Sequence, residues 1–182
     1  HLEHRRQRQM CIRDRVSAIR DTTGNDIIVL SGGVSKGEYD LVRETIEGEG
    51  GVVVFHGIAA KPGKPVLLAT LGHRLVLGLP GNPVSALVMG NLLLVPAIRA
   101  MGRHRRVWPR HFKARLTGPL TSTGGRTTFF PGRLRTEGTA AVQPLPHNGS
   151  GDLTGFAAAD CLIRRPARAE ALEAGAEVDV VM

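Results

Sequence analysis

The spacing of apolar residues in the first half of the chain predicts alternating strands and helices. Residues 26–30 form a short β-branched run between glycine turns, which is typical of a parallel strand buried on both faces. Apolar positions from Leu41 to Ile46 recur at helical spacing, and the glycines that follow Glu47 end this helix. Further strand patterns occupy residues 52–55, 65–70 and 75–79, the last two joined as a hairpin.

The longest apolar stretch runs from Pro83 to about Met101 and predicts a helix that is buried nearly all round. Asn82 is placed to cap this helix, Pro83 to begin it and Gly102 to end it, with a kink at Pro96. We expect no membrane span, because no run approaches the roughly 20 apolar residues that a span requires.

The pattern changes at Arg103, where a basic segment up to Pro109 has the composition of a linker. Beyond it, five short segments punctuated by turns predict a small all-β barrel or sandwich, at residues 111–116, 126–130, 140–144, 161–164 and 177–181. We therefore expect three regions, which are a tail over residues 1–20, an α/β domain over 21–102 and a β domain over 103–182.

The formal net charge of +8 is divided between the tail and the rest of the chain, because residues 1–20 alone carry +4. This tail has no apolar periodicity and no secretory leader pattern. Its run from Arg8 to Arg15 resembles a translated sequencing adapter, so we interpret residues 1–20 as non-native or disordered. The remaining charge lacks interleaved aromatic residues, which disfavours a nucleic-acid binder. The two cysteines, Cys11 and Cys161, give neither a disulfide framework nor a metal-ligand spacing.

The first candidate site lies where the strand over residues 26–30 ends. A turn follows it, made of Ser31, Gly32 and Gly33. Ser35 and Glu38 then have the spacing of a capping box that opens a helix. A strand, a glycine turn and a helix N-terminus can bind an anion, and Asp40 is near enough to hold a metal ion or orient a phosphate. Taken alone, the same pattern also occurs as a structural turn in α/β proteins.

Two proline-rich loops supply further candidates. Lys61 and Lys64 lie on a loop stiffened by prolines, and two cations on a preorganised loop suit an oxyanion. The loop that enters the long apolar helix presents freed N–H groups together with a hydroxyl, through Pro80, Asn82, Pro83 and Ser85. In the β-rich half, Ser150 lies among small residues that let it reach a ligand. Each loop on its own is also compatible with a solvated turn.

Taken together and in this order, four motifs closely resemble the molybdopterin molybdenumtransferase family of the MoeA and gephyrin E-domain type. The motifs are Ser31-Gly-Gly-Val-Ser35 with Gly37-Glu-Tyr-Asp40, Lys61-Pro-Gly-Lys-Pro65, Gly78-Leu-Pro-Gly-Asn-Pro-Val-Ser85 and Gly149-Ser-Gly151. The likeness covers residues 26–182. It implies an α/β fold, with a partial Mog-like three-layer domain built on a mostly parallel sheet, followed by a small all-β C-terminal domain.

The resemblance implies a reaction of adenylylated molybdopterin with molybdate that gives molybdenum cofactor and AMP, assisted by Mg²⁺ or another divalent ion. Asp40 matches the acidic residue needed for this step, as metal ligand or orienter of the phosphoanhydride, and Lys61 and Lys64 match its cations. The implied substrate-binding positions are Ser31, Gly32, Gly33, Ser35, Pro65, Pro80, Asn82, Pro83, Ser85 and Ser150. These roles agree with the chemistry of the substrates, because molybdate is a tetrahedral dianion and adenylylated molybdopterin contains a phosphoanhydride. Both bind best to cations and preorganised hydrogen-bond donors.

The resemblance further implies a cytoplasmic homodimer that shares a pathway with molybdopterin adenylyltransferase and binds neither a specific nucleic acid nor a membrane. Gly57 stands where the family often has a basic residue, and Pro131 stands where an arginine is expected, with Arg133 as a candidate substitute. Two preceding domains of the family and the first half of its α/β domain have no counterpart in this sequence. We therefore expect a fragment that is incomplete for catalysis.

Two other functions fit parts of the sequence. Gly33-Val-Ser35-Lys-Gly37 has the pattern of the nucleophile elbow of a serine hydrolase, with Glu137 and His147 as the available partners. The other alternative is a non-catalytic module that dimerises or binds a peptide. Retention of Asp40 and of both loop lysines favours chemistry over the scaffold, because a scaffold has no physical need of them.

Overall fold

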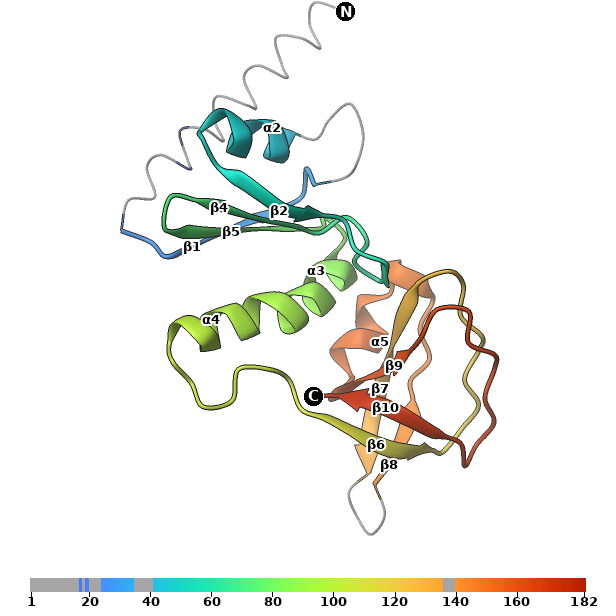
Figure 1. The fold of residues 1–182 in the computed structure, drawn as a ribbon. Helices are drawn as coiled ribbons and strands as arrows, with labels where there is room; N and C mark the ends of the chain where they lie inside the picture. Colours follow the sequence, from blue (N-terminus) through green and yellow to red (C-terminus); the bar gives the residue numbers. More distant parts are fainter. Residues whose placement is uncertain (1–16, 18, 20–23, 35–40, 136–139) are drawn as a thin grey trace, which may run out of the picture. The chain divides into compact units, whose positions relative to one another are not determined.

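The computed structural model describes residues 17, 19, 24–34, 41–135 and 140–182 (Figure 1). The chain falls into two compact units. Unit 1 consists of His1–Ile58 and Pro65–Gly81, and unit 2 of Ala59–Lys64 and Asn82–Met182. The long apolar helix therefore groups with the β-rich half, whereas the sequence placed it in the α/β domain. The predicted boundaries at residues 20 and 102 stay predictions.

Unit 1 contains a four-stranded sheet in the order β1-β5-β4-β2 (Figure 1). The strands are β1 (Ile27–Ser31), β2 (Val52–His56), β4 (Leu67–Leu71) and β5 (Arg74–Leu79). Only β1 and β5 run parallel, while β4 pairs antiparallel with both β5 and β2. The prediction of a mostly parallel sheet was wrong, because the two-residue turn between β4 and β5 can join only antiparallel strands.

The core of unit 1 lies between this sheet and the helix α2 (Leu41–Gly48). Val42 and Ile46 of α2 pack there against side chains of the strands, and Ile19 is buried with them. Val29 of β1 is 43% exposed. The expectation that this strand is buried on both faces was therefore wrong, because Ile28 and Leu30 pack in the core while Val29, on the opposite face, is exposed.

Unit 2 is built around a closed β-barrel (Figure 1). Its strands are β6 (His111–Leu116), β7 (Thr127–Arg135), β8 (Ala141–Pro144), β9 (Cys161–Arg165) and β10 (Glu177–Val181). They follow the order β7-β8-β6-β10-β9, and β9 pairs back onto β7, which closes the barrel. Each of the five predicted segments overlaps one of these strands, although β7 continues five residues beyond its predicted segment. A sixth, two-residue strand, β3 (Ala60–Lys61), adds to β7 in parallel and was not predicted.

The long helix begins and ends where the sequence indicated. It consists of α3 (Pro83–Met89), a π-helical turn η1 (Gly90–Leu94) and α4 (Val95–Met101). The Asn82 side chain accepts a hydrogen bond from the Ser85 amide at 3.0 Å, so the predicted cap is present. The irregular turn ends at Leu94, two residues before Pro96, which cannot donate a backbone hydrogen bond. Gly102 ends the helix.

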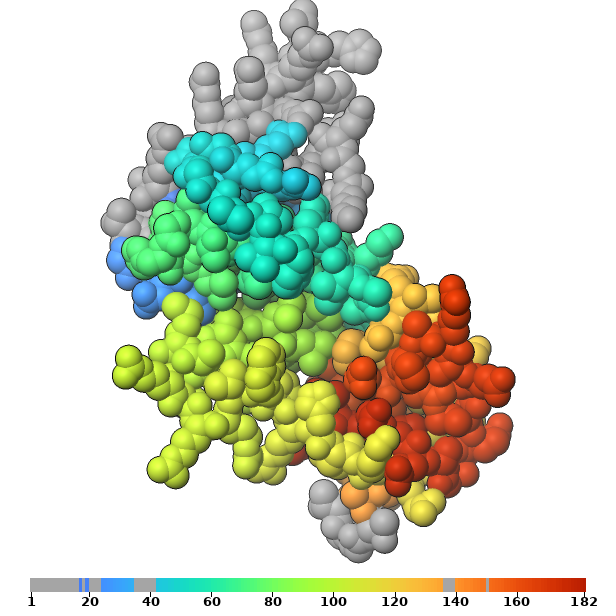
Figure 2. Space-filling model, in the orientation of Figure 1, coloured from blue at the N-terminus to red at the C-terminus, as the bar shows by residue number. Residues whose placement is uncertain are grey.

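Burial of this helix is less complete than predicted, since Leu87 and Ile98 are 40% and 52% exposed. By length and composition alone, Pro83–Met101 is also long and apolar enough to cross a membrane. The expectation that no apolar run approaches the length of a membrane span was therefore wrong for this helix. The criterion is weak evidence, because the core helix of a soluble protein meets it equally. After the helix, the segment over residues 102–110, yellow-green to yellow in Figure 2, lies at the surface. It lies within unit 2, so its role as a linker between domains stays a prediction.

Candidate functional site

In unit 1, the glycine turn lies beside the loop that follows β5. Ser31 at the end of β1 pairs with Leu79 at the end of β5, and the Gly32 N–H donates to the Leu79 carbonyl at 3.0 Å. Gly32 and Gly33 have φ angles of +81° and +72°, which other residues rarely adopt. Because both strands are parallel, the turn and Pro80 emerge at one edge of the sheet. This is the edge at which ligands bind in open α/β sheets.

The chain leaves this turn through a well-anchored residue. Val34 is buried, and its carbonyl accepts a hydrogen bond from Nε2 of His56 at 2.9 Å. His56 lies next to Gly57, at which the family often has a basic residue. Ser35, Glu38 and Asp40 lie outside the described residues, so their predicted roles as cap, helix start and metal ligand stay predictions.

In unit 2, the Lys61–Lys64 loop contacts the barrel at Lys61 and the helix α3 at Gly63. Lys61 pairs with Thr128 through the short strand β3, and the Lys61–Pro62 peptide bond is cis. Gly63 has a φ of +113° and lies so close to Met89 of α3 that a β-carbon would come within 2.5 Å of that side chain. Both lysine side chains are exposed. The role of this loop in binding an oxyanion stays a prediction, and Pro65 falls in unit 1.

A cavity of about 200 Å³ lies beside this loop, within unit 2. It brings Lys61 together with Gly149, so that two motifs separated by almost ninety residues share one concavity. Its remaining lining consists of Pro62, Thr121, Ser122, Thr123, Gly124, Thr128, Phe129, Phe130, His147 and Phe156. Lys61 and four hydroxyl residues therefore line a space together with three phenylalanines, and the hydroxyls of Thr123 and Thr128 already donate to backbone carbonyls. This combination suits an oxyanion held by an organic body.

His147 also lines this cavity, although the sequence suggested it only as a member of a hydrolase triad. Its ring lies edge-on between Phe130 and Phe156, with both ring centroids at 5.6 Å, and its Nδ1 lies 3.4 Å from the Leu145 carbonyl. The sequence suggested His147 only as a partner of Ser35 and Glu137 in a hydrolase triad. Ser35 and Glu137 lie outside the described residues, so that alternative stays an untested prediction.

The loop that carries Ser150 is held by one carboxylate. Asp152 caps the helix α5 (Leu153–Ala157) by accepting from the Gly155 amide at 3.2 Å, and it accepts from the Asn148 amide at 3.0 Å. The hydrogen bonds from Asn148 and Gly155 lower the pKa of Asp152 below its ordinary value. Ser150 lies in the 3₁₀ turn η2 (Gly149–Gly151), which contacts α3. The backbone at Ser150 is thus brought close to the helix that Asn82 caps.

Some predicted site residues are less available than the sequence suggested. Ser85 is buried, and its amide is satisfied by the Asn82 side chain, so the first turn of α3 presents fewer free donors than expected. Arg133 donates to the Ala158 carbonyl at 3.1 Å and does not line the cavity. Within the described ranges, no group of three His, Cys, Asp or Glu residues could hold a metal ion. A divalent ion at Asp40 therefore stays a prediction.

Comparison with known proteins places both halves of the chain. Residues 2–100 match the family described as "Probable molybdopterin binding domain", and residues 113–182 match the "MoeA C-terminal region (domain IV)". The chain belongs to the molybdopterin molybdenumtransferase family. Within it, the sequence is 30% identical over 159 residues to a molybdopterin molybdenumtransferase of Staphylococcus aureus (strain COL), and 38% identical over 141 residues to one of Haemophilus influenzae.

Solved structures of this family agree with the fold. A molybdopterin biosynthesis MoeA protein from Pyrococcus horikoshii superposes with a TM-score of 0.71 at 36% identity, over 92% of this chain and 40% of its own. A second MoeA structure from the same organism, with a TM-score of 0.67 at 23% identity, supports the fold alone. The match to the Staphylococcus aureus relative covers 87% of this chain and 38% of the relative. The match to the Haemophilus influenzae relative covers 76% of this chain and 35% of the relative. The molybdenumtransferase fold here thus has a mixed sheet and a C-terminal β domain.

Proposed function

We propose that this chain contributes to molybdenum insertion into adenylylated molybdopterin, in which molybdate and adenylyl-molybdopterin give molybdenum cofactor and AMP. The observation that carries the proposal is the cavity in unit 2 that Lys61 and Gly149 share. It joins the Lys-Pro-Gly motif to the Gly-Ser-Gly motif, although nothing in their sequence separation requires it. Membership of the family supplies the reaction, since curated relatives carry the name molybdopterin molybdenumtransferase.

The chemistry of the cavity fits the inorganic substrate. Molybdate is a tetrahedral dianion, so it gains from a fixed cation and from donors that need no reorganisation. Lys61 supplies the cation, and the hydroxyl groups of Thr121 and Ser122 supply donors, whereas the Thr128 hydroxyl donates to the Arg126 carbonyl. Phe129 and Phe130 exclude water on another side, which strengthens these electrostatic interactions.

The remaining roles follow from the family and from the motifs. We assign Asp40 to orienting the phosphoanhydride, together with Mg²⁺ or another divalent ion. Lys64 neutralises charge on the leaving AMP, and Ser35, Ser85 and Ser150 donate to the substrate. The enzyme of which this region is part works in the cytoplasm as a homodimer, downstream of a molybdopterin adenylyltransferase. Because the chain spans less than two fifths of its curated relatives, we propose that it supplies part of the site.

The test is a calorimetric titration of adenylylated molybdopterin into the chain, with and without Mg²⁺, after circular dichroism has established that the chain is folded. We expect metal-dependent binding that Asp40→Asn weakens while the spectrum stays unchanged. Lys113→Ala is the control, because Lys113 is an exposed lysine of the barrel that lies outside the cavity and pairs with Asp179. Binding that is indifferent to Mg²⁺ and to Asp40→Asn would sink the assignment of Asp40.

A scaffold role makes the opposite forecast. If the chain only dimerises or binds a peptide, the Asp40→Asn variant should still capture that peptide in a pull-down. Titration of molybdate should then give no heat with either the parent chain or the variant. That result would replace the catalytic proposal with the scaffold alternative.

A further inference from the structure

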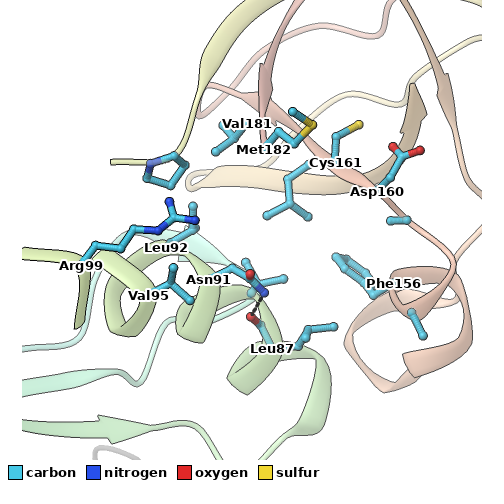
Figure 3. A pocket seen from close by; sticks show the side chains of 15 residues that line it. Leu87, Asn91, Leu92, Val95, Arg99, Phe156, Asp160, Cys161, Val181 and Met182 are labelled. Atoms are coloured by element: carbon cyan, nitrogen blue, oxygen red, sulfur yellow. Dashed lines mark hydrogen bonds between the residues drawn. The ribbon is translucent and has the colours of Figure 1, made fainter. Parts of the chain in front are cut away.

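A second cavity of unit 2, of about 280 Å³, lies between the long helix and the barrel. Leu87, Leu92 and Val95 line it from the helix, and Phe156, Leu162 and Val181 line it from α5 and the strands. Figure 3 shows Leu92 and Val95 on the helix side of the cavity and Val181 on the strand side. Asn91, Arg99 and Asp160 also line the cavity, and the Asp160 carboxylate accepts from the Leu134 amide at 2.8 Å. The apolar part of these walls suits an apolar group of modest size.

Next to it lies a cleft of opposite character. Four arginines and one histidine line this cleft, and they are Arg99, His104, Arg105, Arg106 and Arg110. Met182 completes the lining. Residues 99–110 contain no acidic residue. None of the ion pairs within the described part of the chain involves any of these arginines. Four arginines therefore line one cleft, which gives it a net positive charge even with the carboxyl group of Met182 counted.

Arg99 and Met182 line both the apolar cavity and the basic cleft, so the two spaces adjoin. Arg99 lies on α4 beside Val95, at the side of the cavity away from Asp160 (Figure 3). Two backbone hydrogen bonds tie Arg110 to Met182, at 2.8 and 3.0 Å, which fixes the linker to the barrel at this junction. The basic cleft is therefore held at the edge of the apolar cavity, in a position that a freely moving linker would not keep.

We propose that these two spaces together bind an amphiphilic anion, namely an apolar chain that carries a phosphate group. The apolar part enters the cavity between the helix and the barrel, and the phosphate lies against the arginines. Guanidinium groups favour phosphate because their planar forks donate two hydrogen bonds at once. A plain solvated linker explains the exposure of the arginines, but it does not explain why they border an apolar cavity. The proposal does not depend on molybdenum insertion, because neither space contains Lys61 or Gly149.

The test is a calorimetric titration of the full chain with octyl phosphate below its micelle concentration, compared with inorganic phosphate and with octanol. We expect octyl phosphate to bind at least about tenfold more tightly than either part alone, since both spaces contribute. The double variant Arg105→Glu/Arg106→Glu should weaken octyl phosphate by about tenfold or more. Val95→Phe, which fills the cavity, should weaken octyl phosphate and leave inorganic phosphate unchanged.

The matched control is Arg135→Glu/Arg168→Glu, which makes the same charge change at exposed arginines that do not line the cleft. It should bind octyl phosphate as the parent chain does. Equal binding of octanol and octyl phosphate, or equal losses in the two double variants, would overturn the proposal. A parallel sedimentation with phosphatidic acid vesicles distinguishes a membrane lipid from a soluble ligand, because only the former retains the chain on vesicles.

Discussion

Val34 fills the space that a side chain at position 78 would need. A β-carbon on Gly78 would lie 2.5 Å from Cγ1 of Val34 and 3.3 Å from Cβ of Leu67. Real β-carbons do not approach other atoms to 2.5 Å, so one of the neighbours would have to move. Because Val34 directly follows the Ser31–Gly33 turn, this close approach holds the end of the turn against strand β5.

Gly78→Ala should therefore destabilise unit 1. We expect the free energy of unfolding to fall by about 1–3 kcal/mol, as for other insertions into a packed core. Urea denaturation measures the change. Gly48→Ala is the matched control, since a β-carbon on Gly48 meets nothing within 4 Å and stability should be unchanged or slightly raised. Equal stability of the two variants would show that the contact with Val34 adapts without cost.

Lys61→Ala should weaken molybdate binding more than Lys64→Ala does. Lys61 lines the cavity with Thr128 and Gly149, whereas Lys64 is exposed and does not line it. Loss of one charge-assisted contact corresponds to about a tenfold loss of affinity. Titration of molybdate into both variants and into Lys113→Ala measures the difference. Similar losses in Lys61→Ala and Lys113→Ala would mean that only the net charge matters.

Asp152 should make the 147–155 loop sensitive to acid. Its pKa is lower in the folded chain than the ordinary value of 3.8, because backbone amides donate to the carboxylate. The stabilisation is therefore complete above pH 3.8, declines as the pH falls below that value and is lost below the folded pKa. Amide hydrogen exchange at Asn148 and Gly155 across this range measures it. Protection that stays constant through the range would contradict the assigned role.

Cys161 should be inert toward thiol reagents in the folded chain. Burial raises its pKa to about 12, with Asp160 adding to the effect, so almost no thiolate is present at neutral pH. A disulfide-exchange reagent applied to a Cys11→Ser variant should react quickly after denaturation and at least about a hundredfold more slowly before it. Rapid reaction of the folded variant would mean that unit 2 opens locally around β9.

Much of the local structure could be predicted from sequence, because it depends on neighbouring residues. Strands β6 and β10 begin and end where their patterns do, and Asn82 caps the helix as its position before Pro83 indicated. The errors concern partners that are distant in sequence. Alternating apolar residues do not reveal that β4 pairs antiparallel with β2, nor that Ala60 and Lys61 join strand β7.

The candidate site shows the same division. The sequence identified Lys61 and the loop around Ser150 as separate motifs, but not the cavity that Lys61 shares with Gly149. The hydroxyl residues Thr121 and Ser122 carried no signal, because they lie in a turn-rich stretch with no regular spacing. Their place in the cavity follows from the closure of the barrel, which is a property of the whole unit.

The strand order also determines when each unit can form during synthesis. Every strand of the unit 1 sheet has been translated once Leu79 emerges, so that sheet can assemble early. In unit 2, β10 lies between β6 and β9, so the barrel stays open until residue 181 has left the ribosome. Until then β6 and β9 each lack a neighbour, and exposed strand edges of this kind recruit other chains. The barrel is therefore the unit whose strand edges stay exposed longer during synthesis.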